Sequence, residues 1–382
     1  MTSTRPLMCQ APSVDATTST ASADPAPTDA TARLRRGLLA VEHNQMVRLS
    51  PNGTAVAFLR IGGDDHELWL RPVDGTERRL AALDGEIVGD IRWSGDGQWV
   101  LFLHVQRGRE LWRLSAVDLT TDRCLLMPVP GIVTEFWVSR NRPAIAVSCR
   151  PPGSARADLF RLDLKSSEEI ECKLLSRNPG FHRWLVDGEL SPRGGTRLDR
   201  DGSVSLFVGP APHEAREKLR LDPDTGMDFA VLGFSRDGAR LYVLTSWNAP
   251  TRRLLSIDLR TQEPTCVFSD PSFDVAGYPI GRDGVWFNPI TGDPDLCATI
   301  DQRLRLHPLD ERLLGKLASV KRAGAITVPL ERDNTDSRWL VAHVHDDAPM
   351  EYEVVDTRTS TAAPLFLNRP NIAGYELSNL DD

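Results

Sequence analysis

The hydrophobic and polar residues of this chain follow the pattern of short β-strands joined by tight turns. Apolar or β-branched runs such as "AVAFL", "WVLFL" and "RLYVLT" come after polar phrases such as "SPNGT", "SGDGQ" and "SRDGA". In these phrases Asn or Asp precedes Gly, a pair that tolerates the positive φ values of a two-residue hairpin turn. The chain is therefore predicted to consist largely of β-hairpins.

The turn phrase recurs along the chain with the spacing of a repeat protein. Its copies lie about 47 residues apart on average, which is within the range of propeller blades. A further strand often follows and ends in an acidic turn, as in "ELWLRPVDG" and "RLLSIDLRTQE", so each unit is predicted to hold three or four antiparallel strands. The copies are Pro51-Asn52-Gly53, Gly95-Asp96-Gly97, Arg140-Asn141-Arg142, Arg200-Asp201-Gly202, Arg236-Asp237-Gly238, Arg282-Asp283-Gly284 and Arg332-Asp333-Asn334.

A single small sheet cannot bury both of its faces, whereas seven copies arranged radially close a ring. Helical patterns are confined to "HEAREKL" from His213 and "DERLLGKLASV" from Asp310. We therefore predict an all-β fold, a seven-bladed β-propeller of four-stranded antiparallel blades over residues 33–370. Residues 1–32 are predicted to be a disordered tail, because their Thr, Ser, Ala, Pro and Asp bury little apolar surface. Residues 371–382 are predicted to be an exit segment, by which the chain leaves the propeller. The alternative fold is a pair of β-sandwiches.

Composition and charge narrow the class of protein. The chain is 41% hydrophobic and 26% charged, as in soluble globular proteins. Its formal net charge of -8 argues against nucleic acid or an anionic membrane as partner. No apolar run approaches the roughly 18 residues of a membrane span, and the N-terminus lacks the apolar core of a signal peptide, so a cytoplasmic location is expected. The six cysteines are widely spaced and predict free thiols, with neither a metal nor another cofactor.

The order of several phrases resembles a known family. "LSPNGTAVAFLR", then "WSGDGQWVLFLH", then "FHRWLVDGELSPRGGTRLDRDG" is similar to the N-terminal propeller of prolyl oligopeptidase family serine peptidases, of the acylaminoacyl-peptidase-like branch. The stretch from Trp339 to the end resembles that propeller's last blade and the segment leaving it. In this family an α/β-hydrolase domain with a Ser-Asp-His triad follows the propeller. The chain contains neither G-x-S-x-G nor His-Gly-Gly, so no serine peptidase activity is expected from it alone.

The resemblance to a propeller suggests candidate ligand-binding residues. The innermost strand of each blade should precede the turn phrase, so its first residues should face the central channel. Converging carboxylates and an Arg could bind a polar ligand or a cation, although propeller channels are also polar because water fills them. His182 could act as a general base if Asp187 or Glu189 orients it, or it could simply pack beside Trp184. The channel candidates are Gln45, Asp90, Glu135, Arg193, Asp228 and Asp274.

Three further features have competing interpretations. His343 and His345 alternate along a strand, so both could ligate a metal, or they could lie at an exposed strand end. Trp247 is expected to be exposed in a loop, where it could contact a ligand. Arg252 and Arg253 are expected to be solvated charges.

The sequence is compatible with two functions. The first is a non-catalytic propeller resembling the gating or substrate-access domain of prolyl oligopeptidase-like enzymes, which binds a peptide, a small molecule or a partner protein. A separate α/β-hydrolase or another protein would dock on one face, which should carry an apolar patch. The second is a stand-alone propeller enzyme of cyclase, lyase or lactonase type, acting on a small metabolite in the channel during small-molecule biosynthesis. The chain could also be part of a longer peptidase.

Overall fold

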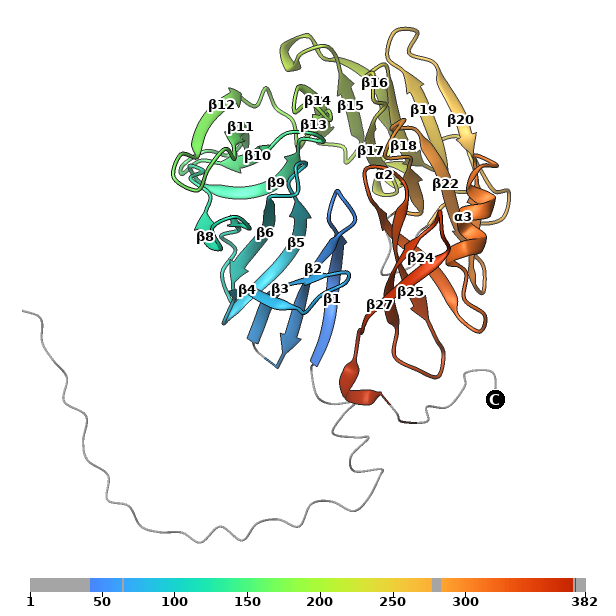
Figure 1. Ribbon diagram of the computed structural model, residues 1–382. Helices are drawn as coiled ribbons and strands as arrows, with labels where there is room; N and C mark the ends of the chain where they lie inside the picture. The colour runs from blue at the N-terminus through green and yellow to red at the C-terminus, as the bar shows by residue number, and fades with distance from the viewer. Residues whose placement is uncertain (1–41, 64, 277–282, 374, 376–382) are drawn as a thin grey trace, which may run out of the picture.

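The computed structural model of the protein describes residues 42–63, 65–276, 283–373 and 375. The predicted tail of residues 1–32 and most of the predicted exit segment, residues 371–382, lie outside this part of the chain. The described residues form seven antiparallel sheets arranged in a ring (Figure 1). The predicted seven-bladed β-propeller is confirmed.

Each blade is built from strands that are consecutive in the chain. Blades 1 to 3 consist of β1 (Glu42–Leu49), β2 (Ala55–Gly62), β3 (Asp65–Pro72) and β4 (Arg78–Ala82); β5 (Glu86–Trp93), β6 (Trp99–Gln106), β7 (Arg113–Asp118) and β8 (Arg123–Leu126); and β9 (Ile132–Val138), β10 (Ala144–Arg150), β11 (Asp158–Asp163) and β12 (Glu171–Ser176). The first strands of neighbouring blades contact one another, β1 with β5 and β24, so the first strand of each blade is innermost.

Blades 4, 5 and 7 have the same four-stranded plan. They consist of β13 (Arg183–Val186), β14 (Pro192–Leu198), β15 (Val204–Val208) and β16 (Arg216–Leu221); β17 (Ala230–Phe234), β18 (Arg240–Thr245), β19 (Arg253–Asp258) and β20 (Pro264–Phe268); and β24 (Ile326–Arg332), β25 (Arg338–Val344), β26 (Glu351–Asp356) and β27 (Thr361–Leu367). The predicted helix "HEAREKL" is wrong, because this stretch forms a 3₁₀ turn, η1 (Pro212–Glu214), followed by β16. The short helix α2 (Pro223–Met227) was not predicted.

Blade 6 departs from this plan. It contains only three strands among the described residues, β21 (Val285–Phe287), β22 (Pro294–Ile300) and β23 (Leu304–Pro308). The predicted helix "DERLLGKLASV" forms as α3 (Leu313–Val320), which follows β23 where other blades have a fourth strand. Figure 1 shows α3 at the outer rim of the ring, and its Leu313 and Val320 pack against Trp286 and Leu296 of blade 6 and Trp339 of blade 7.

The first hairpin of most blades is fixed by a local hydrogen-bonding motif. In the β5–β6 turn, Ser94 N donates to Trp99 O at 2.9 Å, and Ser94 Oγ accepts from Trp99 N at 2.9 Å. Gly97 has a φ of 72°, which a side chain would disfavour. Asp333 takes the place of the serine in blade 7 and accepts from Arg338 N at 2.9 Å. The recurring phrase is thus a self-contained turn.

The phrase does not mark the same hairpin in every blade. In blade 4 the Asp201-Gly202 turn joins the second and third strands, and the first hairpin is instead closed by Asp187 N donating to Ser191 O at 3.1 Å. In blade 6 Gly284 precedes the inner strand β21, and the first hairpin is Asn288–Asp293, with Asn288 N to Asp293 O at 2.9 Å. Arg282 lies outside the described residues. The Asp-Gly phrase therefore predicts a hairpin but not its position in the blade.

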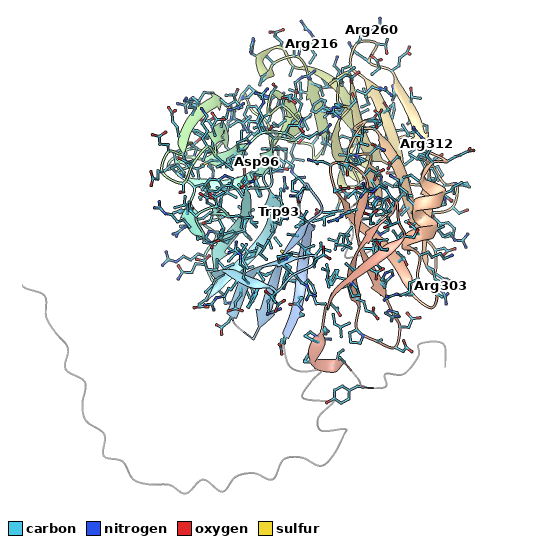
Figure 2. All side chains as sticks on the ribbon, viewed as in Figure 1. Trp93, Asp96, Arg216, Arg260, Arg303 and Arg312 are labelled. Atoms are coloured by element: carbon cyan, nitrogen blue, oxygen red, sulfur yellow. The ribbon has the colours of Figure 1, made fainter. Side chains whose placement is uncertain are left out.

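The core is divided among the spaces between blades. Each of the seven pairs of neighbouring blades shares one buried apolar cluster, and Figure 2 shows side chains filling these spaces. Between blades 2 and 3, for example, Leu101, Phe136 and Ile145 are almost completely buried. The stability of the ring therefore depends on contacts between neighbouring blades, as expected for stacked repeats.

The ring closes without exchanging a strand, as far as the described residues show. At the seam between blades 7 and 1, the rings of Phe58 and Phe366 lie 4.4 Å apart, and Leu49 N donates to Glu331 Oε2 at 2.7 Å. Asn44 N also donates to Asn368 O at 2.8 Å. Side-chain packing and a few hydrogen bonds therefore hold the seam closed.

The two faces of the ring can be told apart by strand direction. The last residues of β1 contact the last residues of β5, since Trp93 Nε1 donates to Arg48 O at 3.0 Å, so the inner strands run parallel. We call the face where the inner strands begin the terminal face, because β1 begins and β27 ends there, with η2 (Pro370–Ile372) beside them in Figure 1. The opposite face, which carries the first hairpins, is the turn face.

Candidate functional site

Charged side chains of opposite sign alternate around part of the ring, from one inner strand to the next. Arg48 of β1 lies 3.7 Å from Glu331 of β24 and 3.3 Å from Asp90 of β5. Asp90 in turn lies 2.7 Å from Arg92 on the same strand. These pairs join blades 7, 1 and 2 beside the central axis. Asp90, predicted to face the channel, lies at the centre of this group.

The alternation continues into blades 3 and 4. Glu135 of β9 lies 3.9 Å from Arg183 of β13, and Arg92 NH1 donates to the backbone carbonyl of Phe136 at 2.6 Å. Burial raises the pKa of Glu135; the neighbouring Asp90 adds to this effect, while Arg183 and Arg92 oppose it. Glu135 therefore takes up a proton more readily than a free glutamate does. We call Glu331, Arg48, Asp90, Arg92, Glu135 and Arg183 the inner arc.

The structure places two other predicted residues away from the inner arc. Asp228 follows α2 and Asp274 precedes blade 6, both at the terminal face. Arg252 joins them, because its Nε lies 3.4 Å from Asp228 Oδ1 and its backbone N donates to Asp274 Oδ1 at 2.6 Å. The expectation that Arg252 is a solvated charge is wrong, since only 18% of its side chain is exposed. Gln45 is half-buried on β1, beside a bulge in its pairing with β2.

Arg193 and His182 do not occupy the predicted positions. Arg193 lies on β14, the second strand of its blade. The prediction placed it on the innermost strand because it took the Asp201-Gly202 turn as the first hairpin of the blade. Its guanidinium lies 3.4 Å from Asp187 and 5.2 Å from the Phe234 ring centroid, at the contact between blades 4 and 5. His182 is exposed at the start of β13, whereas Asp187 follows the end of that strand. Asp187 therefore does not orient His182.

The paired histidines of blade 7 are not an exposed strand end, as one interpretation held. His343 is completely buried, with Nε2 2.6 Å from Glu353 Oε1 and Nδ1 3.1 Å from Thr327 Oγ1. His345 Nε2 lies 3.5 Å from Glu351. Within the described ranges, no group of three or more His, Cys, Asp or Glu side chains is arranged to hold a metal ion.

Blade 2 contains a Ser-His-Glu trio that the sequence analysis missed. His104 Nε2 is hydrogen-bonded to Ser115 Oγ at 2.8 Å, and His104 Nδ1 is hydrogen-bonded to Glu86. These are the residue types of a catalytic triad, but Ser115 is only 5% exposed and lies within a strand, so a substrate carbonyl has no approach to its hydroxyl. Burial lowers the pKa of His104, an effect that Glu86 opposes. The similar buried trio around His343 in blade 7 indicates a packing role for both.

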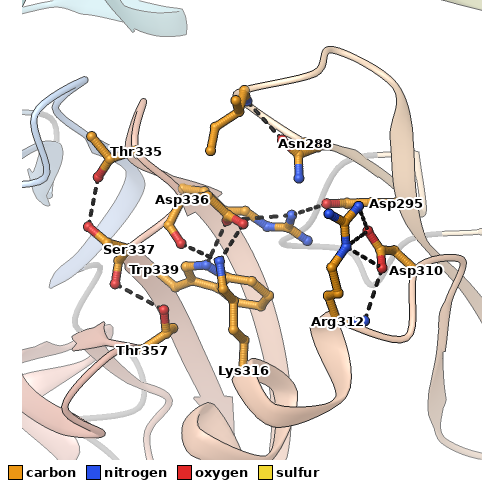
Figure 3. A network of polar contacts seen from close by, with 12 residues as sticks. Asn288, Asp295, Asp310, Arg312, Lys316, Thr335, Asp336, Ser337, Trp339 and Thr357 are labelled. Atoms are coloured by element: carbon orange, nitrogen blue, oxygen red, sulfur yellow. Dashed lines mark hydrogen bonds and ion pairs between the residues drawn. The ribbon is translucent and has the colours of Figure 1, made fainter.

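Buried charges also lie between blades 6 and 7 (Figure 3). The side chain of Arg332 is 3% exposed, and its NH1 lies 2.7 Å from Asp295 Oδ2. Its guanidinium stacks 4.1 Å from the Trp339 ring centroid. Lys316 of α3 lies 2.6 Å from Asp336. Burial raises the pKa of Asp295, an effect that Arg332 opposes.

Two grooves open between neighbouring blades. Trp247, expected to be exposed, is half-buried and lines a groove of about 320 Å³ together with Lys218 and Arg220. A larger groove of about 940 Å³ lies between β23, α3 and the start of β24. No helix among the described residues has the length and apolar character needed to span a membrane.

Exposed apolar side chains favour the terminal face. Met227 in α2 is 91% exposed, and Leu111 and Leu198 lie exposed in or next to loops on the same face. Ile87 is exposed at the start of β5, also on this face. On the turn face, the exposed large hydrophobic residue of the described chain is Ile290.

The comparisons agree with this architecture. The ring is a propeller of the kind found in prolyl oligopeptidase-type peptidases, as the resemblance in the sequence implied. Dipeptidyl aminopeptidase BIII of Pseudoxanthomonas mexicana is 26% identical over 340 residues, which cover 87% of this chain and 48% of that protein. The chain thus spans about half the length of the curated relative that it matches. No family model matches the chain.

Solved structures show the same fold at low identity. A prolyl endopeptidase has a TM-score of 0.57 at 12% identity and covers 88% of this chain and 52% of its own. For the puromycin-hydrolyzing peptidase of Mycobacterium tuberculosis the TM-score is 0.55 at 13% identity, and the match covers 92% of this chain and 55% of that protein. For the propeller domain of the trilobed protease from Pyrococcus furiosus the TM-score is 0.54 at 11% identity, and the match covers 85% of this chain and 99% of that domain. That domain is described as having an open velcro topology.

Proposed function

We propose that this chain is a substrate-access propeller that works by binding. Its terminal face holds an α/β-hydrolase domain, in the same or a separate polypeptide, and its inner arc contacts peptides that pass through the channel. The observation that carries this proposal is the match to one half of a dipeptidyl aminopeptidase, over 87% of this chain. A cytoplasmic location remains a prediction.

The distribution of apolar surface supports the choice of face. Met227, Leu111 and Leu198 are exposed on the terminal face, where β1 begins and β27 ends. Exposed apolar residues that gather on one face are typical of a surface that another protein covers. A domain joined to either end of the ring would reach this face first.

The inner arc supports a role in peptide contact. It offers guanidinium donors and carboxylate acceptors beside the axis, and Glu135 can carry a proton more readily than a solvated glutamate. Such groups suit the backbone and the charged termini of a peptide. Neither the guanidinium groups nor the carboxylates of the inner arc supply an activated nucleophile.

The test is docking to a purified α/β-hydrolase encoded in the same or the neighbouring gene. Binding is measured by sedimentation velocity for the wild type and for Met227→Asp and Leu198→Asp. Each of these variants should weaken the complex at least about tenfold, since a carboxylate is buried at the contact. Ile290→Asp, on the turn face, is the matched control and should change the affinity less than about twofold. The absence of a complex, or equal weakening by the control, would refute the proposal.

One observation favours a second candidate function, the conversion of a small metabolite in the channel. A carboxyl group whose pKa is raised by burial is typical of a general acid, and Glu135 is such a group. The chain would be incubated with a metabolite extract from its source, and depletion would be followed by mass spectrometry. Depletion that is lost in Glu135→Gln but kept in Ile290→Asp would support this function, and equal depletion in both would contradict it.

A further inference from the structure

Blade 6 is the one blade of the described ring whose sheet ends at its third strand. The other six blades each carry a fourth strand, from the four residues of β8 to the seven residues of β27. The outer edge of β23 therefore has no neighbouring strand among the described residues. Such an edge presents backbone N–H and C=O groups that can pair with another chain.

The pairing register identifies the unpaired groups. Ala298 of β22 faces Leu306 of β23, and the backbone N and O of Ala298 bond toward the inner side, to Gly284 and Ala276. Because hydrogen-bonded and non-hydrogen-bonded pairs alternate in an antiparallel ladder, the N–H and C=O of Leu306 and Leu304 must point outward. Leu309 N, which donates to Asp295 O at 2.8 Å, fits the same alternation. No hydrogen bond among the described residues uses these outward groups.

The groove of about 940 Å³ opens beside this edge. Leu304 and Leu306 form one wall, Leu317 and Val320 of α3 form another, and Ile326 closes the groove at the start of β24. Leu304 and Leu306 are only half-buried and Arg305 between them is exposed, so α3 leaves β23 partly accessible. The side chains of an added strand would alternate between this groove, whose lining is both apolar and polar, and solvent.

The lining of the groove carries more cations than carboxylates. Arg303, Lys321 and Arg322 line it together with a single carboxylate, that of Asp346. Arg322 is ion-paired with Glu351 and with Glu353, whereas Lys321 is exposed. Figure 2 shows Arg303 at the terminal-face end of the blade. Because Glu351 and Glu353 already face Arg322, an acidic residue of an occupant would match Lys321.

We propose that the edge of β23 binds an extended acidic peptide segment of a partner protein, which completes blade 6 as its fourth strand. The segment runs antiparallel to β23, pairs with the backbone of Leu304 and Leu306, and places alternate apolar side chains in the groove. A flanking carboxylate contacts Lys321. This is strand addition, in which backbone hydrogen bonds give affinity and alternate side chains give specificity.

The probe is a labelled synthetic peptide, Asp-Leu-Thr-Val-Thr-Leu-Asp, titrated into the full chain by fluorescence anisotropy. Three peptide controls are used: one with Lys in place of both Asp, and two N-methylated at alternate backbone amides, so that one of the pair blocks the donors facing β23. Lys321→Glu should weaken binding of the acidic peptide about tenfold. Arg260→Glu, at the rim of blade 5 (Figure 2), should change it less than about twofold.

Hydrogen exchange then locates the peptide. The amides of Leu304 and Leu306 should be unprotected in the free chain and protected in the complex. The proposal is overturned if the lysine peptide or both methylated peptides bind as tightly, or if these amides stay unprotected. Protection already present in the free chain would also overturn it, because a segment of the chain itself or a second copy would then fill the groove. The outcome does not depend on whether a hydrolase docks on the terminal face.

Discussion

The interface between blades 2 and 3 and the interface between blades 6 and 7 solve the same packing problem differently. The interior of the first is apolar, with Leu101, Phe136 and Ile145 buried there, and charged contacts lie at its two ends: Arg92 donates to Phe136 O at the channel, and Arg123 lies 3.9 Å from Glu168 at the outside. The second buries Arg332 against Asp295 in its interior. The 2–3 interface joins two four-stranded sheets, whereas blade 6 ends in a helix. Both interfaces have a buried apolar cluster, and the irregular pair adds a buried ion pair to it.

The largest effect is expected where that charge is buried. Arg332→Leu should lower the free energy of unfolding by about 4 kcal/mol, because it leaves Asp295 buried without its partner. Urea unfolding measures this loss. The double variant with Asp295→Leu should recover most of it, since replacing both charges restores an apolar contact. A double variant no more stable than Arg332→Leu would contradict the assignment.

Truncating matched leucines compares how the two interfaces relax. Leu101 and Leu296 are both completely buried, one in each interface. Leu101→Ala should cost about 3 kcal/mol, because two rigid sheets cannot close the cavity. Leu296→Ala should cost about 2 kcal/mol, since α3 can move toward the space. Equal losses in urea unfolding would show that the helix is held as firmly as a strand.

A glycine tests how closely the turn of blade 2 approaches blade 3. A Cβ on Gly95 would lie 2.2 Å from the backbone oxygen of Ser139, so Gly95→Ala must push the two blades apart. We expect a loss of about 2 kcal/mol in urea unfolding. Gly62→Ala, where a Cβ meets nothing within 4 Å, is the control and should change stability by less than about 0.5 kcal/mol. Similar values for both would mean that the contact is loose.

The smallest effect concerns Glu135 at the inner end of the 2–3 interface. Its folded pKa is raised by burial above the ordinary 4.5, so the folded state binds this proton more tightly than the unfolded state does. The stability that it contributes is present at low pH and lost as the pH rises through the folded pKa. Glu135→Gln should therefore be at least as stable as wild type at pH 7, and this advantage should shrink as the pH falls.

Glu353, beside the 6–7 interface, is expected to make stability depend on pH in the opposite direction. The hydrogen bond from His343 lowers the pKa of Glu353, so its contribution is present above the unfolded pKa and lost as the pH falls through the folded pKa. Glu353→Gln should be less stable than wild type at pH 7, and the difference should shrink in acid. Urea unfolding between pH 4 and 8 checks both variants, and parallel curves would contradict this contrast.

The sequence predicted the repeat but not the irregular blades, for a local reason. Ser94 and Gly97 specify a turn with hydrogen bonds that close within six residues, so the turn can be recognised without knowledge of the fold. The same chemistry suits any hairpin. The Asp201-Gly202 turn was therefore assigned to the first hairpin of blade 4, and Arg193 was placed on an inner strand.

The candidate site was partly predictable. Asp90 and Glu135 were found because their blades follow the regular order, and both lie in the inner arc. Their partners Arg48 and Arg183 were missed, because ion pairs across blades join residues about one repeat apart and leave no local pattern. The buried trio around His104 was missed for a related reason: its three members come from three strands, and cross-strand geometry brings them together.

The seam described above has a consequence for chain connectivity. Every sheet is made of consecutive strands, and Asn44 lies next to Asn368, so the natural ends of the ring are neighbours in space. A circular permutant that links these ends and opens the loop between β4 and β5 would keep all seven sheets whole. In a propeller whose last blade is completed by a strand from the N-terminal end of the chain, the same circular permutation would separate that strand from its blade.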